Sequence, residues 1–471
     1  MSEGLYVILA TALIFSLAGI WYARGKRFTL EDFISARGSS ALWTTVATLV
    51  ASSMGAWILF SPAEATIRNN VIALIGYALG SAAALFLFAF VGQRLRDLMP
   101  NGHSITEYVY HRFGTAMYLL VVIISVFYMS VFLTAELTGI ALAAQLVFNI
   151  PLLYTAVIVG VGTLAYTSLG GIRASVFTDT LQSLLIIPLL LLLFLASLFL
   201  FNGFESLSES ASVSPQMFNG NFLPGIEAAF AFLIAIVAAN WFHQGYWQRV
   251  FLPRTKSNVF RAFTIAGLIV IPIVLITGTF GILSLSAGTA ENASVALFAY
   301  FLQLPIWMVW LVMMLAVALV MSSMDTLLNG LVSLFTVDLM RWRPQSQQPR
   351  LLLFAKWLTV IISFMAIMVA TQGHSVLYLF LVADLVCAAA FFPTVAGLFL
   401  SKYSGNAAFL ASVTGMIAGS FFFPDAAFQG GNLLHAFLAA LLVPIGVSLI
   451  FIPFNKPFDF KILKKLIVSL D

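Results

Sequence analysis

Long apolar runs constrain this chain more than any other feature of its sequence. Only 8% of its 471 residues are charged and 61% are hydrophobic, whereas a soluble domain carries about 25% charged residues. Runs of about 20 apolar residues are long enough to cross the hydrocarbon core of a bilayer as helices. The sequence therefore predicts an all-α polytopic membrane protein, surrounded by lipid and with no room for a soluble catalytic domain.

The apolar runs predict thirteen membrane spans. The first lacks the basic start of a signal peptide, so we expect it to be retained. The predicted spans lie near residues 4–23, 41–63, 70–92, 116–146, 152–168, 174–201, 225–243, 260–286, 305–335, 351–370, 376–400, 406–423 and 432–453.

The positions of Lys and Arg predict the orientation of these spans. If the N-terminus is outside, the segments on the inner side contain 21 of the 22 Lys and Arg, and only Arg68 lies outside. Such a bias is typical of cytoplasmic loops. We therefore expect a multi-pass protein of the cytoplasmic membrane with its C-terminus in the cytoplasm. The net charge of +4 then reflects topology, and no nucleic-acid partner is expected.

Two predicted spans are interrupted by polar or small residues. Residues 51–55, ASSMG, lie near the middle of the second span, and the seventh span ends in AANWFHQGYWQR, residues 238–249. Such residues allow a helix to open and turn free carbonyls toward an ion or a solute. The alternative for ASSMG is a small-residue face that packs against a neighbouring helix.

The order of the spans predicts two halves of opposite orientation. Spans 2–6 and spans 7–11 each contain five helices, and an odd number makes the second set begin on the opposite side of the membrane. This is the parity of an inverted repeat, in which the first helix of each half is central and broken. The predicted segments are 1–40 (peripheral helix and cytoplasmic loop), 41–201 (first repeat), 202–224 (extracytoplasmic loop), 225–400 (second repeat) and 401–471 (two peripheral helices and basic tail).

Ionisable residues inside the spans are candidates for function, because burying them is costly. Asp179 lies about two turns into its span and suits a cation moving inward, although it could instead be a structural partner of a hydroxyl or of Arg173. Glu136 lies deep in the membrane, where Thr134 and Thr138 could satisfy it. Glu64 could pair with Arg68.

A second polar patch, MSSMD at residues 321–325, lies in the ninth span. Ser322 and Ser323 offer hydroxyl oxygens with little fixed charge, which suits Na⁺. The alternative is that both hydroxyls cap backbone carbonyls. Asp325 is one turn from Ser322 and could orient these hydroxyls or meet a basic residue. Asp384, in the eleventh span, has no predicted role.

Several segments of the chain resemble the sodium:solute symporter family, over about residues 28–400. The segments are LEDFISARGSSALWTTVATLVASSMGAW at 30–57, GGIRASVFTDTLQ at 170–182, HQGYWQRVF at 243–251 and VMSSMDTLLNGLVSLFTVDL at 320–339. The resemblance implies a LeuT-type five-plus-five inverted repeat and Na⁺-driven uptake by alternating access, with no cofactor other than Na⁺ as coupling ion.

The resemblance also implies a sodium site. Its ligands would be the backbone carbonyls of Ala51, Met54 and Leu319 and the hydroxyls of Ser322 and Ser323. Asp179 matches a family aspartate that guides sodium inward or binds a second sodium. The hydroxyl that would help a second sodium is replaced by Leu319. Ser53 stands where proline transporters have an aspartate, which disfavours proline as the solute.

A solute site is expected where the two broken helices face each other. The residues expected to line it are Ser52, Ser53, Trp57, Glu136, Asn240, Trp241 and Gln244. Because these residues include no Lys or Arg, amino acids, urea-like amides and quaternary amines are favoured over dense anions. We therefore expect a Na⁺-coupled secondary transporter that imports a small polar solute, not an enzyme. The alternatives are a sensor that keeps the transporter fold and a proton-coupled porter.

Overall fold

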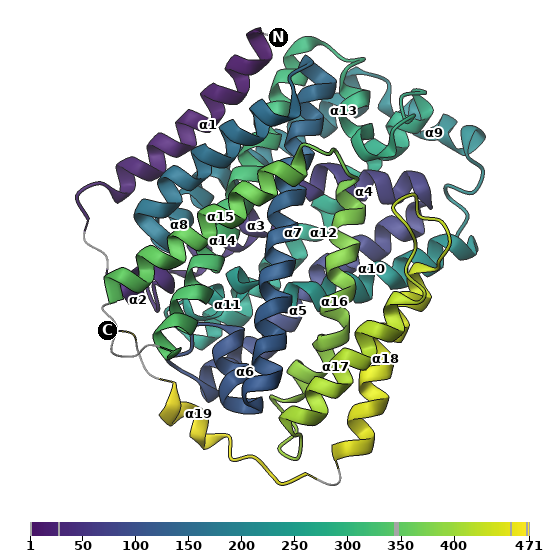
Figure 1. Cartoon of the computed structure of the whole chain (residues 1–471). Coiled ribbons are helices and arrows are strands. Elements are labelled where there is room, and N and C mark those ends of the chain that lie inside the picture. Colours follow the sequence, from purple (N-terminus) through teal and green to yellow (C-terminus); the bar gives the residue numbers. More distant parts are fainter. Residues whose placement is uncertain (1, 27–28, 343–347, 453–454, 468–469, 471) are drawn as a thin grey trace.

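The computed structural model describes residues 2–26, 29–342, 348–452, 455–467 and 470, and this part of the chain is helical with no strand. Figure 1 shows the helices packed side by side. The long helices are α1 (Ser2–Ala23), α5 (Val71–Leu98), α7 (Thr115–Phe148), α8 (Leu152–Leu200), α10 (Leu223–Trp241), α12 (Lys256–Ser286), α14 (Ile306–Trp342), α15 (Gln348–Ala370), α16 (Val376–Ala396) and α18 (Leu433–Phe451). The shorter ones are α2 (Leu30–Ile34), α3 (Leu42–Ser53), α4 (Trp57–Arg68), α6 (Ile105–Phe113), α9 (Gly203–Val213), α11 (Gln244–Phe251), α13 (Ala296–Phe301), α17 (Gly405–Ser420) and α19 (Lys461–Leu466), with a 3₁₀ turn at Ala293–Val295.

Among the described residues, ten helices are long and apolar enough to cross a membrane, and the bent pair α3 and α4 is an eleventh candidate. The all-α membrane architecture is thus confirmed. The predicted spans 152–168 and 174–201 lie in one element, α8, which is interrupted at Gly171, where φ is 55° and ψ is −149°. Helix α17 has only 16 residues. The count of thirteen spans therefore stays a prediction.

Both predicted interruptions are present as breaks between helices. Helix α3 ends at Ser53 and α4 begins at Trp57, with a bend of 54° between them. Met54 is extended there, with φ −106° and ψ 97°. Helices α10 and α11 are separated at residues 242–243, and His243 accepts a hydrogen bond from the backbone N–H of Gly245 through Nδ1 (3.1 Å).

The residues at both breaks are buried, as Met54, Phe242 and His243 show. Helix α3 packs against α8, α12 and α14, and α10 packs against α5 and α16. Helix α14 is buried along most of its length, whereas α18 lies on the outside. The polar breaks are therefore enclosed by other helices and do not face lipid.

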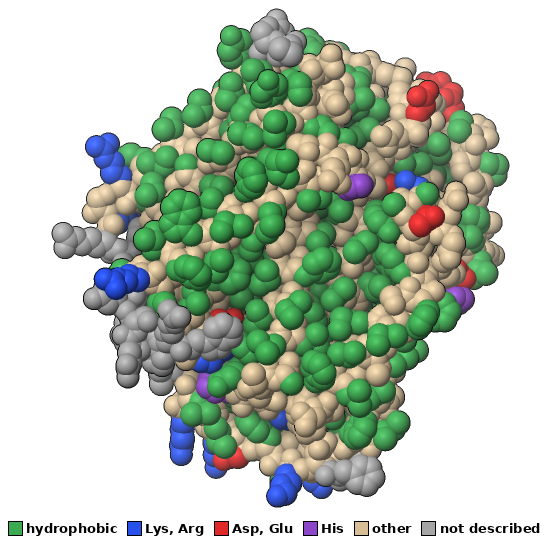
Figure 2. All heavy atoms as spheres, in the orientation of Figure 1, with side chains coloured by type: hydrophobic (Ala, Val, Ile, Leu, Met, Phe, Trp, Pro, Cys, Tyr) green, Lys and Arg blue, Asp and Glu red, His purple; other side chains and the backbone are tan. Residues whose placement is uncertain are grey.

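The outer surface matches a protein embedded in a bilayer. Figure 2 shows apolar side chains spread over the middle of the visible face, with Lys and Arg mostly toward the lower and left edges. Trp21, Leu184 and Phe364 are among the large apolar side chains that are mostly exposed. Two basic residues of the predicted charge pattern, Arg27 and Arg343, lie outside the described residues.

Candidate functional site

A carboxylate from α7 holds the broken helix at the start of α4. Glu136 is fully buried and accepts a hydrogen bond from the backbone N–H of Ala56 (2.6 Å). The hydroxyl of Ser323, from α14, donates to the same oxygen (2.7 Å). Glu136 therefore joins the break to α14.

The expected threonine partners of Glu136 do not bind it. Thr134 donates to the carbonyl of Ser130 (2.9 Å), and Thr138 donates to the carbonyl of Thr134 (2.7 Å). A threonine in a helix often donates to the carbonyl four residues earlier. The partners of Glu136 come instead from two other helices.

Asp179, in α8, is the centre of a second buried network. Its Oδ2 accepts hydrogen bonds from Thr48 (2.5 Å) and Ser52 (3.0 Å), both in α3. Its Oδ1 accepts one from Ser322 in α14 (2.5 Å). The carboxylate thus links the first half of the broken helix to the predicted hydroxyl patch.

Arg249, from α11, completes this network. Its Nη2 lies 3.1 Å from Oδ2 of Asp179, and both side chains are fully buried. The same nitrogen donates to Ser52 (2.6 Å) and to Thr326 (2.8 Å). The sequence pattern counted Arg249 among the basic residues of an inner loop. The structure instead buries it, because a carboxylate and three hydroxyls satisfy its guanidinium group.

Arg173 is not the partner of Asp179. It lies near the surface and pairs with Asp32 at 2.5 Å. Glu64 does pair with Arg68, at 2.8 Å, as predicted.

Asp325 accepts hydrogen bonds mainly from hydroxyl groups of α8. Its donors are Ser175 (2.6 Å), Tyr166 (2.7 Å) and Thr178 (3.1 Å). Within the described residues, no Lys, Arg or His forms an ion pair with it. Neither role predicted for Asp325 is therefore seen, because Ser322 and Ser323 donate to Asp179 and Glu136 instead.

The five residues predicted to bind sodium are all buried and lie in α3, the break and α14. Their exposed fractions do not exceed 1%. Asp179 links Ser322 to α3, and Glu136 links Ser323 to the break, so the hydroxyls lie beside the carbonyl-bearing segment. Oxygen ligands of this kind suit a hard cation such as Na⁺. In the described part of the chain, no cluster of three or more His, Cys, Asp or Glu could hold a metal ion.

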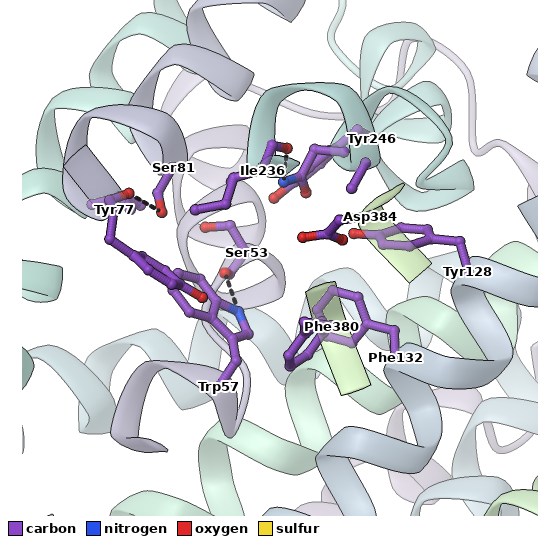
Figure 3. Close-up of a pocket in the computed structure, with 13 residues that line it drawn as sticks. Ser53, Trp57, Tyr77, Ser81, Tyr128, Phe132, Ile236, Tyr246, Phe380 and Asp384 are labelled. Carbon is purple, nitrogen blue, oxygen red and sulfur yellow. Dashed lines mark hydrogen bonds between the residues drawn. The ribbon is translucent and has the colours of Figure 1, made fainter. Parts of the chain in front are cut away.

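A pocket lies next to the breaks and is shown in Figure 3. Ser53, Trp57 and Asn240, all expected at the solute site, line it. The indole N–H of Trp57 donates to the carbonyl of Ser53 (3.1 Å), and its ring stacks on Tyr77 at 5.7 Å between centroids. The described residues that line the pocket are Ser53, Trp57, Tyr77, Ser81, Tyr128, Phe132, Ile236, Ala239, Asn240, Tyr246, Val270, Phe380 and Asp384.

Four residues expected at the solute site do not line this pocket. Ser52 and Glu136 belong to the two carboxylate networks. Trp241 donates to the hydroxyl of Thr394 (2.9 Å), and Gln244 donates to the carbonyl of His103 (2.6 Å). Neighbouring residues on a helix point about 100° apart. Ser53 can therefore face the pocket while Ser52 faces Asp179.

The prediction of the solute site missed Asp384. Among the described residues that line the pocket, it is the one Asp, Glu, Lys, Arg or His. It lies in α16 and is 5% exposed. Its carboxylate points into the pocket, with Tyr128 beside it (Figure 3). The signal that could have found it is the cost of a carboxylate inside a span. Sequence position alone did not show which way the side chain points.

A bundle of membrane helices with two broken helices around a buried pocket defines a secondary transporter. Residues 33–415 match the model of the sodium:solute symporter family. The chain therefore belongs to this family, which confirms the resemblance found in the sequence.

Two curated relatives match most of the chain. A spermidine transporter of Candida albicans is 27% identical over 446 residues, which cover 92% of this chain and 83% of the relative. A sodium/glucose cotransporter of Vibrio parahaemolyticus is 25% identical over 448 residues, with 84% of this chain and 80% of the relative covered. Both are transporters, so the expectation that the chain is not an enzyme is confirmed.

The fold is that of a solved symporter. A Na⁺-coupled sialic acid symporter in a substrate-bound outward-open state superposes with a TM-score of 0.80 at 17% identity, covering 97% of this chain and 98% of that one. This confirms the LeuT-type fold. The family uses Na⁺ as its coupling ion, and a small solute is the second transported partner.

Proposed function

We propose that this protein couples the inward movement of Na⁺ to the import of a small nitrogen-containing solute by alternating access. The solute classes expected from the sequence are amino acids, urea-like amides and quaternary amines, and we extend the last class to amines in general. The observation that carries this proposal is the pocket beside both breaks. It combines aromatic rings with a carboxylate and an amide, and its lining in the described residues contains no Lys or Arg. The relative named a spermidine transporter supports a nitrogen-rich solute.

For sodium, we propose the carbonyls of Ala51, Met54 and Leu319 and the hydroxyls of Ser322 and Ser323. These two hydroxyls now donate to Asp179 and Glu136, and they can rotate to present lone pairs to a cation. Both carboxylates would then supply negative charge close to the ion. In this proposal, Asp179 helps to pass sodium toward the cytoplasm.

We also propose that residues 41–201 and 225–400 form the two inverted repeats, flanked by 1–40, 202–224 and 401–471, with the N-terminus outside. The two breaks support this division, because each lies in the first helix of its half. Alternating access would then occur around these breaks.

The test is solute counterflow in proteoliposomes at fixed pH. Vesicles preloaded with an unlabelled amine or amino acid are diluted into the labelled solute, with Na⁺ or with K⁺ outside. Exchange that requires Na⁺ supports the proposal. Exchange that is indifferent to Na⁺ at fixed pH, together with uptake driven by a pH gradient in a second experiment, indicates a proton-coupled porter. Binding of the solute without any exchange indicates a sensor.

A further inference from the structure

The carboxylate of Asp384 differs from the other carboxylates buried inside this fold. Glu136, Asp179 and Asp325 each accept at least two hydrogen bonds from the protein. Asp384 is 5% exposed, and no described residue donates a hydrogen bond to it or forms an ion pair with it. A buried carboxylate without a partner is costly. The burial of Asp384 is explained if a bound ligand supplies the hydrogen bonds or the opposite charge that the protein does not.

The walls around Asp384 suit a cation. Trp57 stacks on Tyr77, and Phe132 meets Phe380 edge to face with 4.7 Å between ring centroids. All four rings line the same pocket, and Figure 3 shows the carboxylate pointing into the space between them. The faces of aromatic rings attract ammonium groups, and this attraction is stronger where water is excluded.

A second acceptor lies in the same pocket. The Nδ2 group of Asn240 donates to the carbonyl of Ile236 (2.8 Å). This fixes the orientation of the amide, and no described group donates to its Oδ1. A protonated primary amine carries three N–H donors for such acceptors, whereas a quaternary ammonium carries none. The acceptors would stay unsatisfied around a quaternary amine.

We infer that the pocket recognises an organic cation with N–H donors, and that Asp384 is the residue that binds its ammonium group. This inference rests on the proposed function, because it names the solute class of the same site. It narrows the three proposed classes to solutes that carry a protonated amine, a property that amino acids share. Neutral amides lack the charge that Asp384 requires, and quaternary amines lack the donors.

The test measures binding to the purified full-length protein by thermal shift at saturating Na⁺. The probes are putrescine, spermidine, tetramethylammonium and 1,4-butanediol, which is the uncharged analogue of putrescine. For the wild type, we expect at least one of the two polyamines to stabilise the protein, tetramethylammonium to do so more weakly, and 1,4-butanediol to have no effect.

Asp384→Asn keeps the shape of the side chain and removes its charge. A hydrogen bond to a charged group contributes about 1.5–3 kcal/mol, so the Kd of the bound amine should rise about 10- to 100-fold. Glu209→Gln, which removes an exposed carboxylate in α9 far from the pocket, is the control and should bind like the wild type. Asn240→Ala is the second variant, and it should reduce the preference for polyamine over tetramethylammonium.

The inference is overturned if Asp384→Asn binds the amine as tightly as the wild type does. It is equally overturned if 1,4-butanediol binds the wild type as well as putrescine does, or if no cation of the panel binds. If Asp384→Asn fails to fold, the inference is tested by two other results. These are the preference of the wild type for polyamine over 1,4-butanediol and the reduced preference of Asn240→Ala for polyamine over tetramethylammonium. If the amine binds through Asp384 but Na⁺-dependent exchange is not seen, the transport proposal is refuted and the inference about Asp384 stands.

Discussion

The carboxylate of Glu136 accepts a hydrogen bond from the backbone N–H of Ala56 at 2.6 Å, at the point where α4 begins. No side chain of the local sequence caps this helix. The first N–H groups of a helix lack partners within it, and negative charge is favourable there. A residue 80 positions away therefore stabilises the break on which the transport site depends.

Gly55 lies against this carboxylate, and its replacement by alanine should disturb the break. A Cβ atom at Gly55 would be 2.0 Å from Oε1 of Glu136. We expect Gly55→Ala to destabilise the protein by about 1–3 kcal/mol and to reduce Na⁺-dependent uptake. Gly446→Ala is the matched control, because nothing lies within 4 Å of its added Cβ. A Gly55→Ala protein with wild-type melting temperature and uptake would contradict the close packing at this position.

The hydroxyls of Ser322 and Ser323 should determine the affinity for sodium. Replacing both with alanine removes two oxygen ligands. If each contributes about 0.5–1.5 kcal/mol, as a hydrogen bond does, the half-saturating Na⁺ concentration for uptake should rise about tenfold or more. Ser333→Ala in the same helix is the control, because its buried hydroxyl makes no hydrogen bond within the described structure. An unchanged Na⁺ dependence in a folded double variant would disprove the site.

Variants of the ion pair between Asp179 and Arg249 should show whether Asp179 has only a structural role or also a role in sodium movement. Asp179→Asn leaves the guanidinium group of Arg249 buried without its charged partner, which typically costs about 3–5 kcal/mol. Adding Arg249→Gln should restore much of the melting temperature. If Asp179 also serves sodium, the double variant stays impaired in Na⁺ affinity or in Na⁺ release.

The control for this pair is Arg173→Gln. Arg173 and its partner Asp32 are about a third exposed, and exposed ion pairs contribute about 0–1 kcal/mol. Its loss should barely change the melting temperature. Full recovery of both stability and Na⁺ dependence in the Asp179→Asn/Arg249→Gln double variant would show that the pair is purely structural.

His103, in the loop between α5 and α6, should make stability depend on pH. Its Nε2 lies 2.8 Å from Glu31, and its Nδ1 lies 3.3 Å from Glu107. Burial alone would lower the pKa of His103, but the two carboxylates raise it to about 9. Because this pKa is above the ordinary value of 6.5, the protonated histidine stabilises the fold fully below about pH 6.5.

This stabilisation should disappear as the pH rises through about 9. The melting temperature of the wild type should therefore fall by a few degrees between pH 6.5 and pH 9.5, and that of His103→Gln should fall less. His374→Gln, which changes an exposed histidine, should behave like the wild type. Identical pH profiles for His103→Gln and the wild type would argue against a charged His103.

Local features of the sequence determined the membrane architecture and the positions of the breaks. Apolar runs predict membrane helices because the bilayer core offers no water to the backbone. A spanning segment therefore satisfies its N–H and C=O groups within a helix. The ASSMG and HQG segments predict the breaks because small and polar residues weaken a helix where they stand. The hydroxyl pair at Ser322 and Ser323 was predicted because two adjacent hydroxyl oxygens inside a span suit a cation.

Only the tertiary structure decided which polar groups meet. Asp179 and Ser322 are 143 residues apart, and Arg249 reaches both Asp179 and Thr326 from a segment that the charge pattern assigned to an inner loop. The direction of a side chain around its helix also depends on how that helix packs. This is why Ser53 faces the pocket while Ser52 faces Asp179, and why Asp384 was an intramembrane carboxylate without a role until the pocket was seen. The composition and spacing of a segment determine its local structure. A binding site is formed by side chains from helices that are distant in sequence, so it depends on how those helices pack.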